Sequence, residues 1–201
     1  MSPGEKVRAA TAADIPAMTE TICAAFHDDP TWSWAFQDEA RRQEHYRSWW
    51  GLLIEEAMRF EQPAVAVTDE LEAAAVWIPP GEAELSHEGE SRAVELVRDL
   101  VEDHSDAVLE LLDRFEEARP SDPHYYLTLL GVRDDRRGRG VGMRLLASNL
   151  ERSDAEGMPA YLESSNAAND HRYEALGFRR IGEFKTPDDA VMIGTFWRDP
   201  A

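Results

Sequence analysis

The sequence has little of the chemistry that stabilises small secreted proteins or anchors a chain in a membrane. Among 201 residues there is one cysteine, Cys23, so no disulfide can form within the chain. Cys23 lies in an apolar stretch typical of a helix, and we expect it in the core. No window approaches the roughly 20 apolar residues of a membrane span, and residues 1–6 lack the apolar run of a signal peptide. These absences indicate a cytoplasmic protein with no membrane partner.

Positive charge is also scarce. The chain has 21 Lys and Arg against 40 Asp and Glu, a formal net charge of −19. Such a surface repels phosphate backbones and makes nucleic acid a poor partner, whereas a cationic acceptor fits it. Acidity that serves solubility alone is the open alternative. The length and the hydrophobic fraction of 43% predict one domain over residues 1–201, present as a monomer or a homodimer.

Hydrophobic periodicity predicts strands and helices that alternate along the chain. The strongest strand signal is 125–132, which is too apolar for an edge and should be central. We expect the other strands at 7–10, 64–67, 73–78, 160–163, 178–184 and 191–196. We expect helices from the Thr11/Asp14 capping box to about residue 27, and at 39–60, 140–155 and 168–176.

Two segments are harder to assign from the pattern alone. A chain break at residues 28–30 is followed by three aromatic residues within 31–36, for which core packing is favoured over a pocket. The apolar spacing in the acidic segment 82–119 predicts two helices. It is either a substrate-side lid or a solvated structural insertion, and the second interpretation is favoured.

A glycine-rich turn follows the predicted central strand. A helix start has about four unpaired N–H groups and a partial positive charge, so a turn without side-chain bulk can seat a diphosphate on the backbone. Gly138, Gly140 and Gly142 supply that access. Segment 133–144 holds five arginines and two aspartates, a local net charge of +3. The alternative is a plain loop with solvated arginines. The spacing fits neither a Walker loop nor the pattern Gly-x-Gly-x-x-Gly.

The order Arg-x-x-Gly-x-Gly from Arg137 to Gly142 resembles the coenzyme A pyrophosphate loop of the Gcn5-related N-acetyltransferase (GNAT) family. Residues 162–178 resemble the last strand-and-helix motif of that family, in which Asn precedes Tyr and the helix ends in Gly-Phe. The likeness covers nearly the whole chain. It is greatest to the puromycin N-acetyltransferase-like branch, through residues 124–127, 130–132 and 162–164.

This sequence also departs from the family pattern. Asp134 stands where the family often has proline, which should loosen the loop but leave the phosphate contacts intact. Segments 27–60 and 82–119 match no motif of the family, so the resemblance leaves the acceptor open.

The resemblance implies a GNAT fold of the mixed α/β (α+β) class. Its central sheet is mixed, mostly antiparallel, of about seven strands, splayed at the coenzyme site and flanked by helices, here with a helical insertion near 82–119. It implies acetyl-coenzyme A as cosubstrate and no metal. The implied cofactor-binding residues are Leu130, Gly131, Val132, Arg137, Gly138, Arg139, Gly140, Val141, Gly142, Met143, Asn166, Asn169 and Tyr173.

Within this set, the backbone of residues 130–132 should pair with the pantetheine arm, and Gly131 permits close approach. Asn166 or Asn169 either orders the coenzyme arm or caps the last helix.

Acetyl transfer to an amine needs a neutral nucleophile and a proton for the departing thiolate. An amine of pKa about 10.4 is neutral roughly once in 2,500 molecules at pH 7, a cost of about 4.6 kcal/mol. Glu163 is the first candidate for the base, directly or through water, although it could simply hold a loop. His124 is the second candidate. The resemblance implies Tyr173 as the acid that protonates the thiolate, with a packed core tyrosine as the alternative.

These observations predict an N-acetyltransferase that acts on a primary amine of a small molecule, an antibiotic or a metabolite. Transfer should be direct within a ternary complex, because Cys23 is far from the motifs. A protein or peptide acetyltransferase acting on lysine or a chain terminus is one alternative. A non-catalytic coenzyme A sensor is the other.

Overall fold

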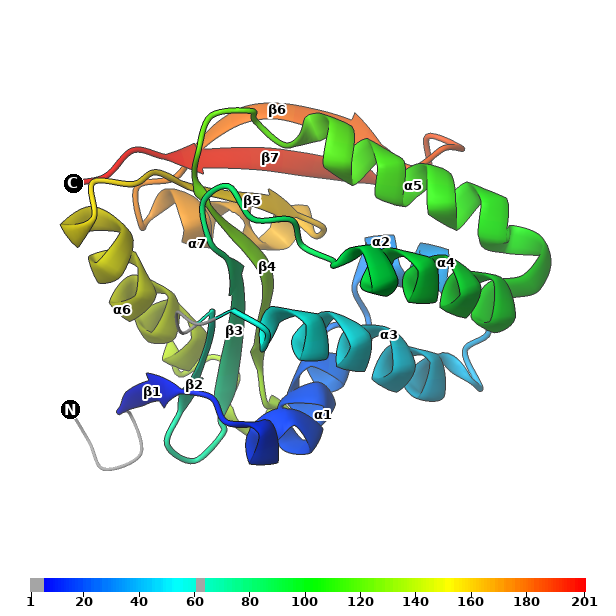
Figure 1. Cartoon of the computed structure of the whole chain (residues 1–201), viewed down its shortest axis with the longest axis horizontal. Coiled ribbons are helices and arrows are strands. Elements are labelled where there is room, and N and C mark those ends of the chain that lie inside the picture. The colour runs from blue at the N-terminus through cyan, green and yellow to red at the C-terminus, as the bar shows by residue number, and fades with distance from the viewer. Residues whose placement is uncertain (1–5, 61–63) are drawn as a thin grey trace.

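The computed structural model describes residues 6–60 and 64–201, and its centre is one seven-stranded sheet (Figure 1). The strand order is β1-β2-β3-β4-β5-β7-β6. All neighbours are antiparallel except β4 and β5, which are parallel. The predicted mixed, mostly antiparallel sheet is confirmed. The strands are β1 (Val7–Ala9), β2 (Val65–Thr68), β3 (Ala73–Ile78), β4 (Tyr125–Val132), β5 (Ala160–Ser164), β6 (Arg179–Lys185) and β7 (Met192–Arg198).

Helices cover both faces of this sheet. Along β3, Ala74, Val76 and Ile78 belong to one hydrophobic core with α1 and α3, whereas Ala75 and Trp77 belong to a second core with α6. This alternation follows from the two-residue period of a strand. The helices are α1 (Ile15–Ala25), α2 (Pro30–Ala35), α3 (Arg42–Ala57), α4 (His87–Val101), α5 (Ser105–Ala118), α6 (Val141–Ala155) and α7 (Asp170–Glu174).

Several sequence predictions are confirmed at these elements, and some lie outside the described residues. Asp14 Oδ2 accepts a hydrogen bond from Thr11 N at 2.8 Å, as the predicted capping box requires. Cys23 is fully buried and free. No described helix is long and apolar enough to cross a membrane. The expected lack of a signal peptide rests mainly on residues 1–5, which lie outside the described residues.

Helix α2 is absent from the sequence prediction, which has a break at this point. Asp29 caps it, because Asp29 Oδ1 accepts hydrogen bonds from Thr31 N at 3.0 Å and Trp32 N at 3.1 Å. Pro30 takes the first helical position. An aspartate directly before a proline is a recognised helix start, so the signal was present in the sequence.

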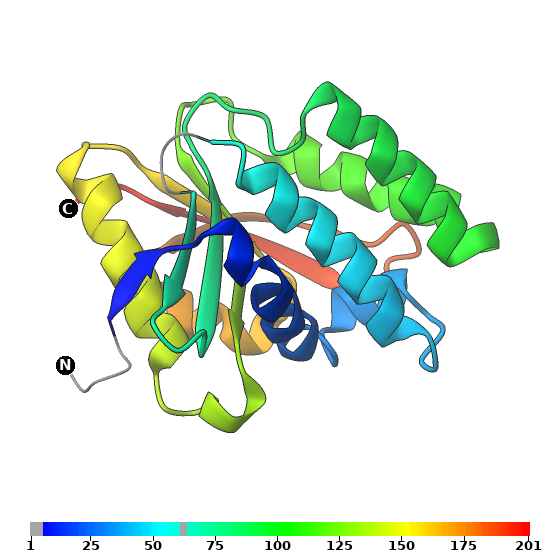
Figure 2. The same cartoon turned by 60° about the horizontal axis from the view of Figure 1, so that its bottom comes forward.

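Segment 82–119 forms the two predicted helices, α4 and α5. Ser86 caps α4 by accepting a hydrogen bond from Gly89 N at 3.0 Å, and Glu56 Oε2 of α3 accepts one from Ser86 N at 2.8 Å. A Cβ on Gly89 would lie 2.6 Å from the Glu56 carboxyl carbon. The absence of a side chain therefore lets α4 pack closely on α3, and Figure 2 shows the helix pair beside α3.

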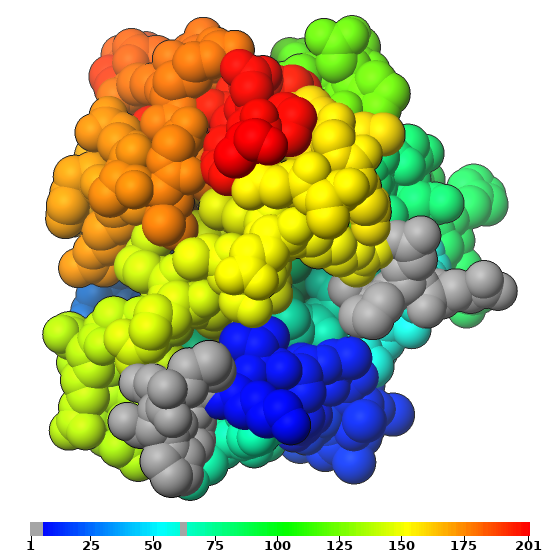
Figure 3. All heavy atoms as spheres, turned by 90° about the vertical axis from the view of Figure 1, so that its left-hand side faces the viewer, coloured from blue at the N-terminus to red at the C-terminus, as the bar shows by residue number. Residues whose placement is uncertain are grey.

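The C-terminal strand is bound to the end of α6. Arg198 on β7 makes two hydrogen bonds with the Asp154 carboxylate, at 2.7 Å and 2.8 Å. The backbone N–H of Ala201 donates to the same carboxylate at 2.8 Å. Figure 3 shows the C-terminal residues lying against this end of α6. Paired hydrogen bonds between arginine and carboxylate fix orientation, so α6 is held at the end opposite its glycine-rich start.

Strands β4 and β5 part in the middle of the sheet. Their pairing runs from Tyr125↔Ala160 to Leu127↔Leu162, yet β4 continues to Val132. Arg133 N donates to Glu72 O of the loop before β3 at 2.8 Å. Because peptide groups alternate in direction along a strand, those of Leu130 and Val132 point away from β3 and into the gap. The predicted splay is present.

Candidate active site

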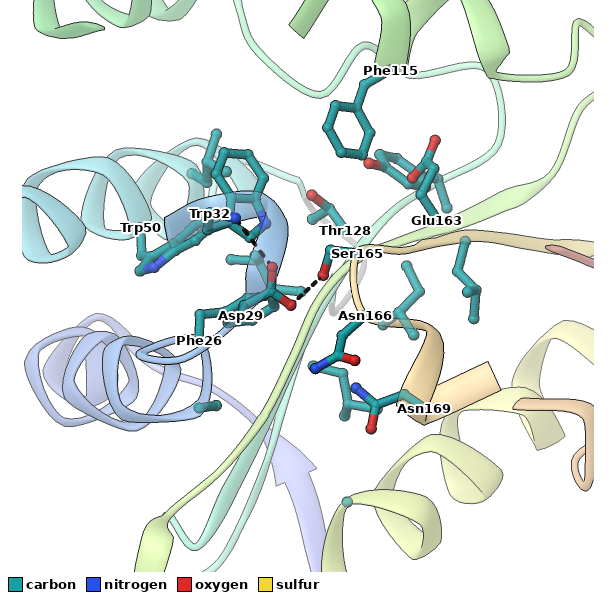
Figure 4. A pocket seen from close by; sticks show the side chains of 18 of the residues that line it. Phe26, Asp29, Trp32, Trp50, Phe115, Thr128, Glu163, Ser165, Asn166 and Asn169 are labelled. Atoms are coloured by element: carbon teal, nitrogen blue, oxygen red, sulfur yellow. Dashed lines mark hydrogen bonds between the residues drawn. The ribbon is translucent and has the colours of Figure 1, made fainter. Parts of the chain in front are cut away.

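A cavity of about 770 Å³ opens where β4 and β5 part. One end is formed by the turn before α6 and the start of that helix. The other end is formed by α1, α2, α3 and segment 82–119. Figure 4 looks into this second end, with Trp32 and Asp29 on one side and Phe115 and Glu163 on the other.

The α6 end of the cavity suits a doubly charged diphosphate. Gly138 and Gly140 have φ of 74° and 72°, a conformation that favours glycine. The helix has no side-chain cap. Its first backbone bond runs from Arg144 N to Gly140 O at 3.0 Å, so the N–H groups of residues 141–143 have no carbonyl partner within the helix. Unpaired helix N–H groups in a glycine-rich turn are a ready anion site.

Arginines surround this helix start. Arg136 and Arg137 both line the cavity. Arg137 is held by Asp134 at 2.8 Å and by Ala24 O of α1 at 2.6 Å. Asp134, the departure from the family pattern, therefore orients an arginine of the turn. The residues present fit a diphosphate group on both charge and shape.

The cavity brings together all the predicted cofactor-binding residues except Gly131 and Arg139. A Cβ on Gly131 would lie 2.7 Å from Ile22 Cδ1 and 3.0 Å from Ala25 Cβ. The close approach that Gly131 permits is therefore that of helix α1. The backbone oxygen of Arg139 accepts a hydrogen bond from Arg144 Nη1 at 2.8 Å.

Asn166 and Asn169 both line the cavity on the loop after β5 (Figure 4). Asn166 Oδ1 accepts a hydrogen bond from Ala168 N at 3.0 Å, which caps the short turn before α7. Asn169 Oδ1 accepts one from Arg172 Nη1 at 3.0 Å. Asn166 therefore caps the turn at residues 167–169 and not the last helix α7, whose N-cap residue Asn169 makes no side-chain cap hydrogen bond within the described residues. Both side chains remain in the cavity wall.

Glu163, the first candidate base, lies on β5 at the cavity wall. Its Oε1 is buried and has no hydrogen-bond partner among the described residues. Burial raises the pKa of Glu163 to about 7, against the lowering effects of the Arg119 charge and of hydrogen bonds with Tyr161 and Tyr126. A carboxylate with a pKa near neutrality can both accept and release a proton at physiological pH.

Tyr173, the candidate acid, also lines the cavity. Burial, together with the negative charges of Asp29 and Asp170, raises the pKa of Tyr173 to about 12. The phenol is therefore protonated at neutral pH and can donate a hydrogen bond or a proton.

His124, the second candidate base, does not belong to this cavity. It is buried, its Nδ1–H donates a hydrogen bond to Asp122 O at 2.6 Å, and its ring lies 5.3 Å from that of Tyr161. Burial lowers the pKa of His124. The histidine packs just before β4 and is not among the described residues that line the cavity, so the structure does not place this second candidate beside the other predicted site residues.

Asp29 is a cavity residue that the sequence analysis missed. It is 7% exposed, and burial raises its pKa despite hydrogen bonds from Ser165, Trp32 and Thr31. Ser165 Oγ donates to Asp29 Oδ2 at 2.7 Å (Figure 4). Thr31 Oγ1 donates to Ser165 O at 2.8 Å. These bonds connect the start of α2 to the loop after β5.

Segment 82–119 supplies much of the other end of the cavity, so the favoured interpretation as a solvated insertion is wrong. Its contributions include Glu84, Phe115, Glu116 and Arg119. Arg119 Nη2 lies 3.0 Å from Glu84 Oε2, and Thr128 Oγ1 of β4 donates to the same carboxylate. The cavity therefore has arginines at the α6 end and an excess of carboxylates at this end.

Comparisons with known proteins agree with this geometry. Residues 93–178 match the model of the acetyltransferase (GNAT) family. A 55-residue segment is 46% identical to L-methionine sulfoximine/L-methionine sulfone acetyltransferases of Pseudomonas paraeruginosa and Pseudomonas aeruginosa. That match spans 26% of this chain and only 32% of each relative.

Solved structures match over nearly the whole chain. A histone acetyltransferase HPA2 and related acetyltransferase from Corynebacterium glutamicum has a TM-score of 0.71 and 25% identity, over 98% of this chain and 96% of that one. A polyamine N-acetyltransferase of Drosophila melanogaster has a TM-score of 0.66 and 18% identity, over 96% and 99% of the two chains. The match to the family model over residues 93–178, the sheet topology and the glycine-rich helix start together identify an acetyltransferase (GNAT) domain with the GNAT fold in this chain.

Proposed function

We propose that this protein transfers an acetyl group from acetyl-coenzyme A to a primary amine of a small molecule. The proposal rests on one observation, the opposite charge character of the two ends of one continuous cavity. An open helix N-terminus with arginines lies at one end, and a buried carboxylate with a pKa of about 7 lies toward the other. A thioester held from the first end would meet an amine held at the second.

Acetyl-coenzyme A, when bound, supplies the acetyl thioester. The N–H groups of residues 141–143 together with Arg136 and Arg137 hold its diphosphate, in line with the anion site described above. The outward-facing peptide groups of Leu130 and Val132 pair with its pantetheine arm, and Asn166 and Asn169 flank the same path.

Glu163 prepares the acceptor by taking a proton from its ammonium group, directly or through one water. The nitrogen lone pair then forms the N–C bond to the acetyl carbonyl carbon while the C–S bond breaks. Tyr173 gives its phenolic proton to the departing sulfur. The second proton lost by the nitrogen restores Tyr173 through solvent, and Glu163 releases its own proton to solvent. The products are the acetamide, the free thiol and one proton.

The carboxylate-rich end of the cavity favours a cation, since Asp29, Glu84 and Glu163 line it against Arg119. A basic peptide is the second candidate acceptor. The observation in its favour is that Glu90, Asp113 and Glu116 line the cavity and are exposed. One-domain organisation, a cytoplasmic location, a monomeric or homodimeric state and membership of the puromycin N-acetyltransferase-like branch remain predictions from the sequence.

The test is thiol release from acetyl-coenzyme A across a panel of small amines and lysine-containing peptides. Titration calorimetry with coenzyme A accompanies it. We expect saturable coenzyme binding and thiol release with at least one small amine. Release with peptides alone would establish the second candidate instead. Coenzyme binding without release for any amine would indicate a sensor, and no binding by folded protein would refute the site.

A further inference from the structure

We infer that the acceptor is a monoamine whose primary amino group is joined to an aromatic ring by a short carbon chain. This inference rests on the proposed function and narrows it. The ring would occupy the chamber formed by α1, α2, α3 and α5, and the ammonium would face Glu163.

Aromatic side chains form the wall of this chamber. Trp32 is at its centre, with ring centroids 4.7 Å from Trp50, 6.2 Å from Trp49 and 5.9 Å from Phe115. Trp32, Trp49 and Trp50 are each at most 8% exposed. Trp49 and Trp50 therefore pack behind the wall, and the ring surface open to an acceptor belongs mainly to Phe26, Trp32 and Phe115, which suits another aromatic ring. The cavity-lining aromatic residues of this end are Phe26, Trp32, Trp49, Trp50, Phe115 and Tyr126.

The charges in the chamber leave a place for one cation. Glu84 is occupied by Arg119 and Thr128, and Asp29 accepts hydrogen bonds from Ser165 and two backbone N–H groups. Glu163 Oε1 has no partner among the described residues. This oxygen is one buried hydrogen-bond acceptor without a partner in the described part of the chain, and it can receive one ammonium group of the substrate.

A second cationic group on the acceptor would meet unfavourable surroundings. The Arg119 guanidinium carbon lies 4.1 Å from the Tyr126 ring centroid and faces the chamber wall. A short diamine with one ammonium at Glu163, too short to reach the exposed rim carboxylates Glu90, Asp113 and Glu116, would place the other beside this guanidinium or against the tryptophan wall. A buried charge without a partner is costly, whereas a neutral ring is not.

An acceptor with its own carboxylate is also disfavoured. Such a group would lie beside the amine, close to Glu163, and the Arg119 cation that could offset it already pairs with Glu84 at 3.0 Å. The exposed rim carboxylates Glu90, Asp113 and Glu116 would repel an acid and attract an amine.

The experiment compares four acceptors: phenethylamine, ethylamine, 1,4-diaminobutane and phenylalanine. We expect kcat/KM for phenethylamine to exceed that of each of the others by about 30-fold, which equals about 2 kcal/mol at 1.4 kcal/mol per factor of ten. Binding is measured separately, without coenzyme, by the change in tryptophan fluorescence. Phenethylamine should saturate the signal at lower concentration than 1,4-diaminobutane does.

The possible failures are distinguishable. Acetylation of ethylamine, 1,4-diaminobutane or phenylalanine as efficiently as phenethylamine would overturn the inference and leave the proposed function standing. Thiol release with none of the four and no fluorescence change with phenethylamine would overturn the inference as well. Coenzyme titration then decides whether the proposed function also fails.

A matched pair of variants tests the wall itself. Phe115→Leu removes a ring that lines the cavity, and we expect the ratio of kcat/KM for phenethylamine to that for ethylamine to fall about fivefold. Phe60→Leu makes the same change at a residue that does not line the cavity and should keep the wild-type ratio. Coenzyme binding confirms that each variant is folded. A ratio unchanged in Phe115→Leu would count against the aromatic chamber.

Discussion

Replacing Glu163 with glutamine should make the protein more stable and less active at the same time. The carboxylate is buried, and burial raises its pKa from 4.5 to about 7. A folded-state pKa above the unfolded value means that the folded protein prefers the protonated form. The corresponding stability is present below pH 4.5 and is lost as the pH rises through 7.

The magnitude follows from the same values. A change from 4.5 to about 7 corresponds to about 3 kcal/mol at 1.36 kcal/mol per pKa unit. Glutamine has nearly the same shape but no charge to bury. The free energy of unfolding of Glu163→Gln at pH 8 should therefore exceed that of the wild type by up to about 3 kcal/mol. At pH 4 the two proteins should be nearly equal.

Activity should change in the opposite direction. Loss of a general base typically costs 10²–10⁴-fold in rate. In the wild type, kcat/KM with an amine of fixed pKa should rise as the pH passes through 7, because Glu163 ionises. This rising limb of the pH–rate profile should be absent in Glu163→Gln. Denaturant unfolding at pH 4 and pH 8 and a pH–rate profile make both measurements. A variant with wild-type turnover and an unchanged profile would refute the assignment of Glu163 as base.

Three further predictions concern neighbouring residues. Tyr173→Phe should lower kcat at least tenfold when chemistry limits the rate, with coenzyme affinity retained by calorimetry; full turnover would exclude the phenol as acid. Arg119→Met removes a charge that lowers the pKa of Glu163, so the pH limb of kcat/KM should move to higher pH; an unmoved limb would contradict this coupling. Gly142→Ala places a Cβ 2.6 Å from Val132 Cγ2. The variant should lose about 1–3 kcal/mol of its free energy of unfolding, measured by thermal unfolding, and bind coenzyme more weakly. Unaltered values would show that the start of α6 shifts to accommodate the added Cβ.

Local patterns in the sequence were sufficient for most of the secondary structure. The apolar run from Tyr125 to Val132 is β4 to the residue, because a strand buried on both faces has a pattern that few other elements share. The glycine-rich turn lies at the start of α6 as predicted, since the left-handed conformations of Gly138 and Gly140 are local properties of glycine. Helix α2 was missed although its start signal, Asp29-Pro30, is local.

The acceptor end of the cavity depends on contacts between distant parts of the chain. Asp29 and Ser165 are 136 residues apart, and Glu84 reaches Arg119 across 35 residues. No spacing rule links such positions, so the sequence left the substrate-side lid as the less favoured interpretation of segment 82–119, which lines the cavity. The same limit explains Gly131, whose missing side chain admits helix α1.

By itself, the sequence determined most of the elements, their order and the glycine-rich turn before α6, because periodicity and turn chemistry are encoded within a few residues. Only the tertiary structure decided which carboxylates are buried together and what Glu163 faces. A pKa near 7 for that carboxyl group depends on burial by several elements and on the nearby Arg119 charge, both of which arise when the chain folds.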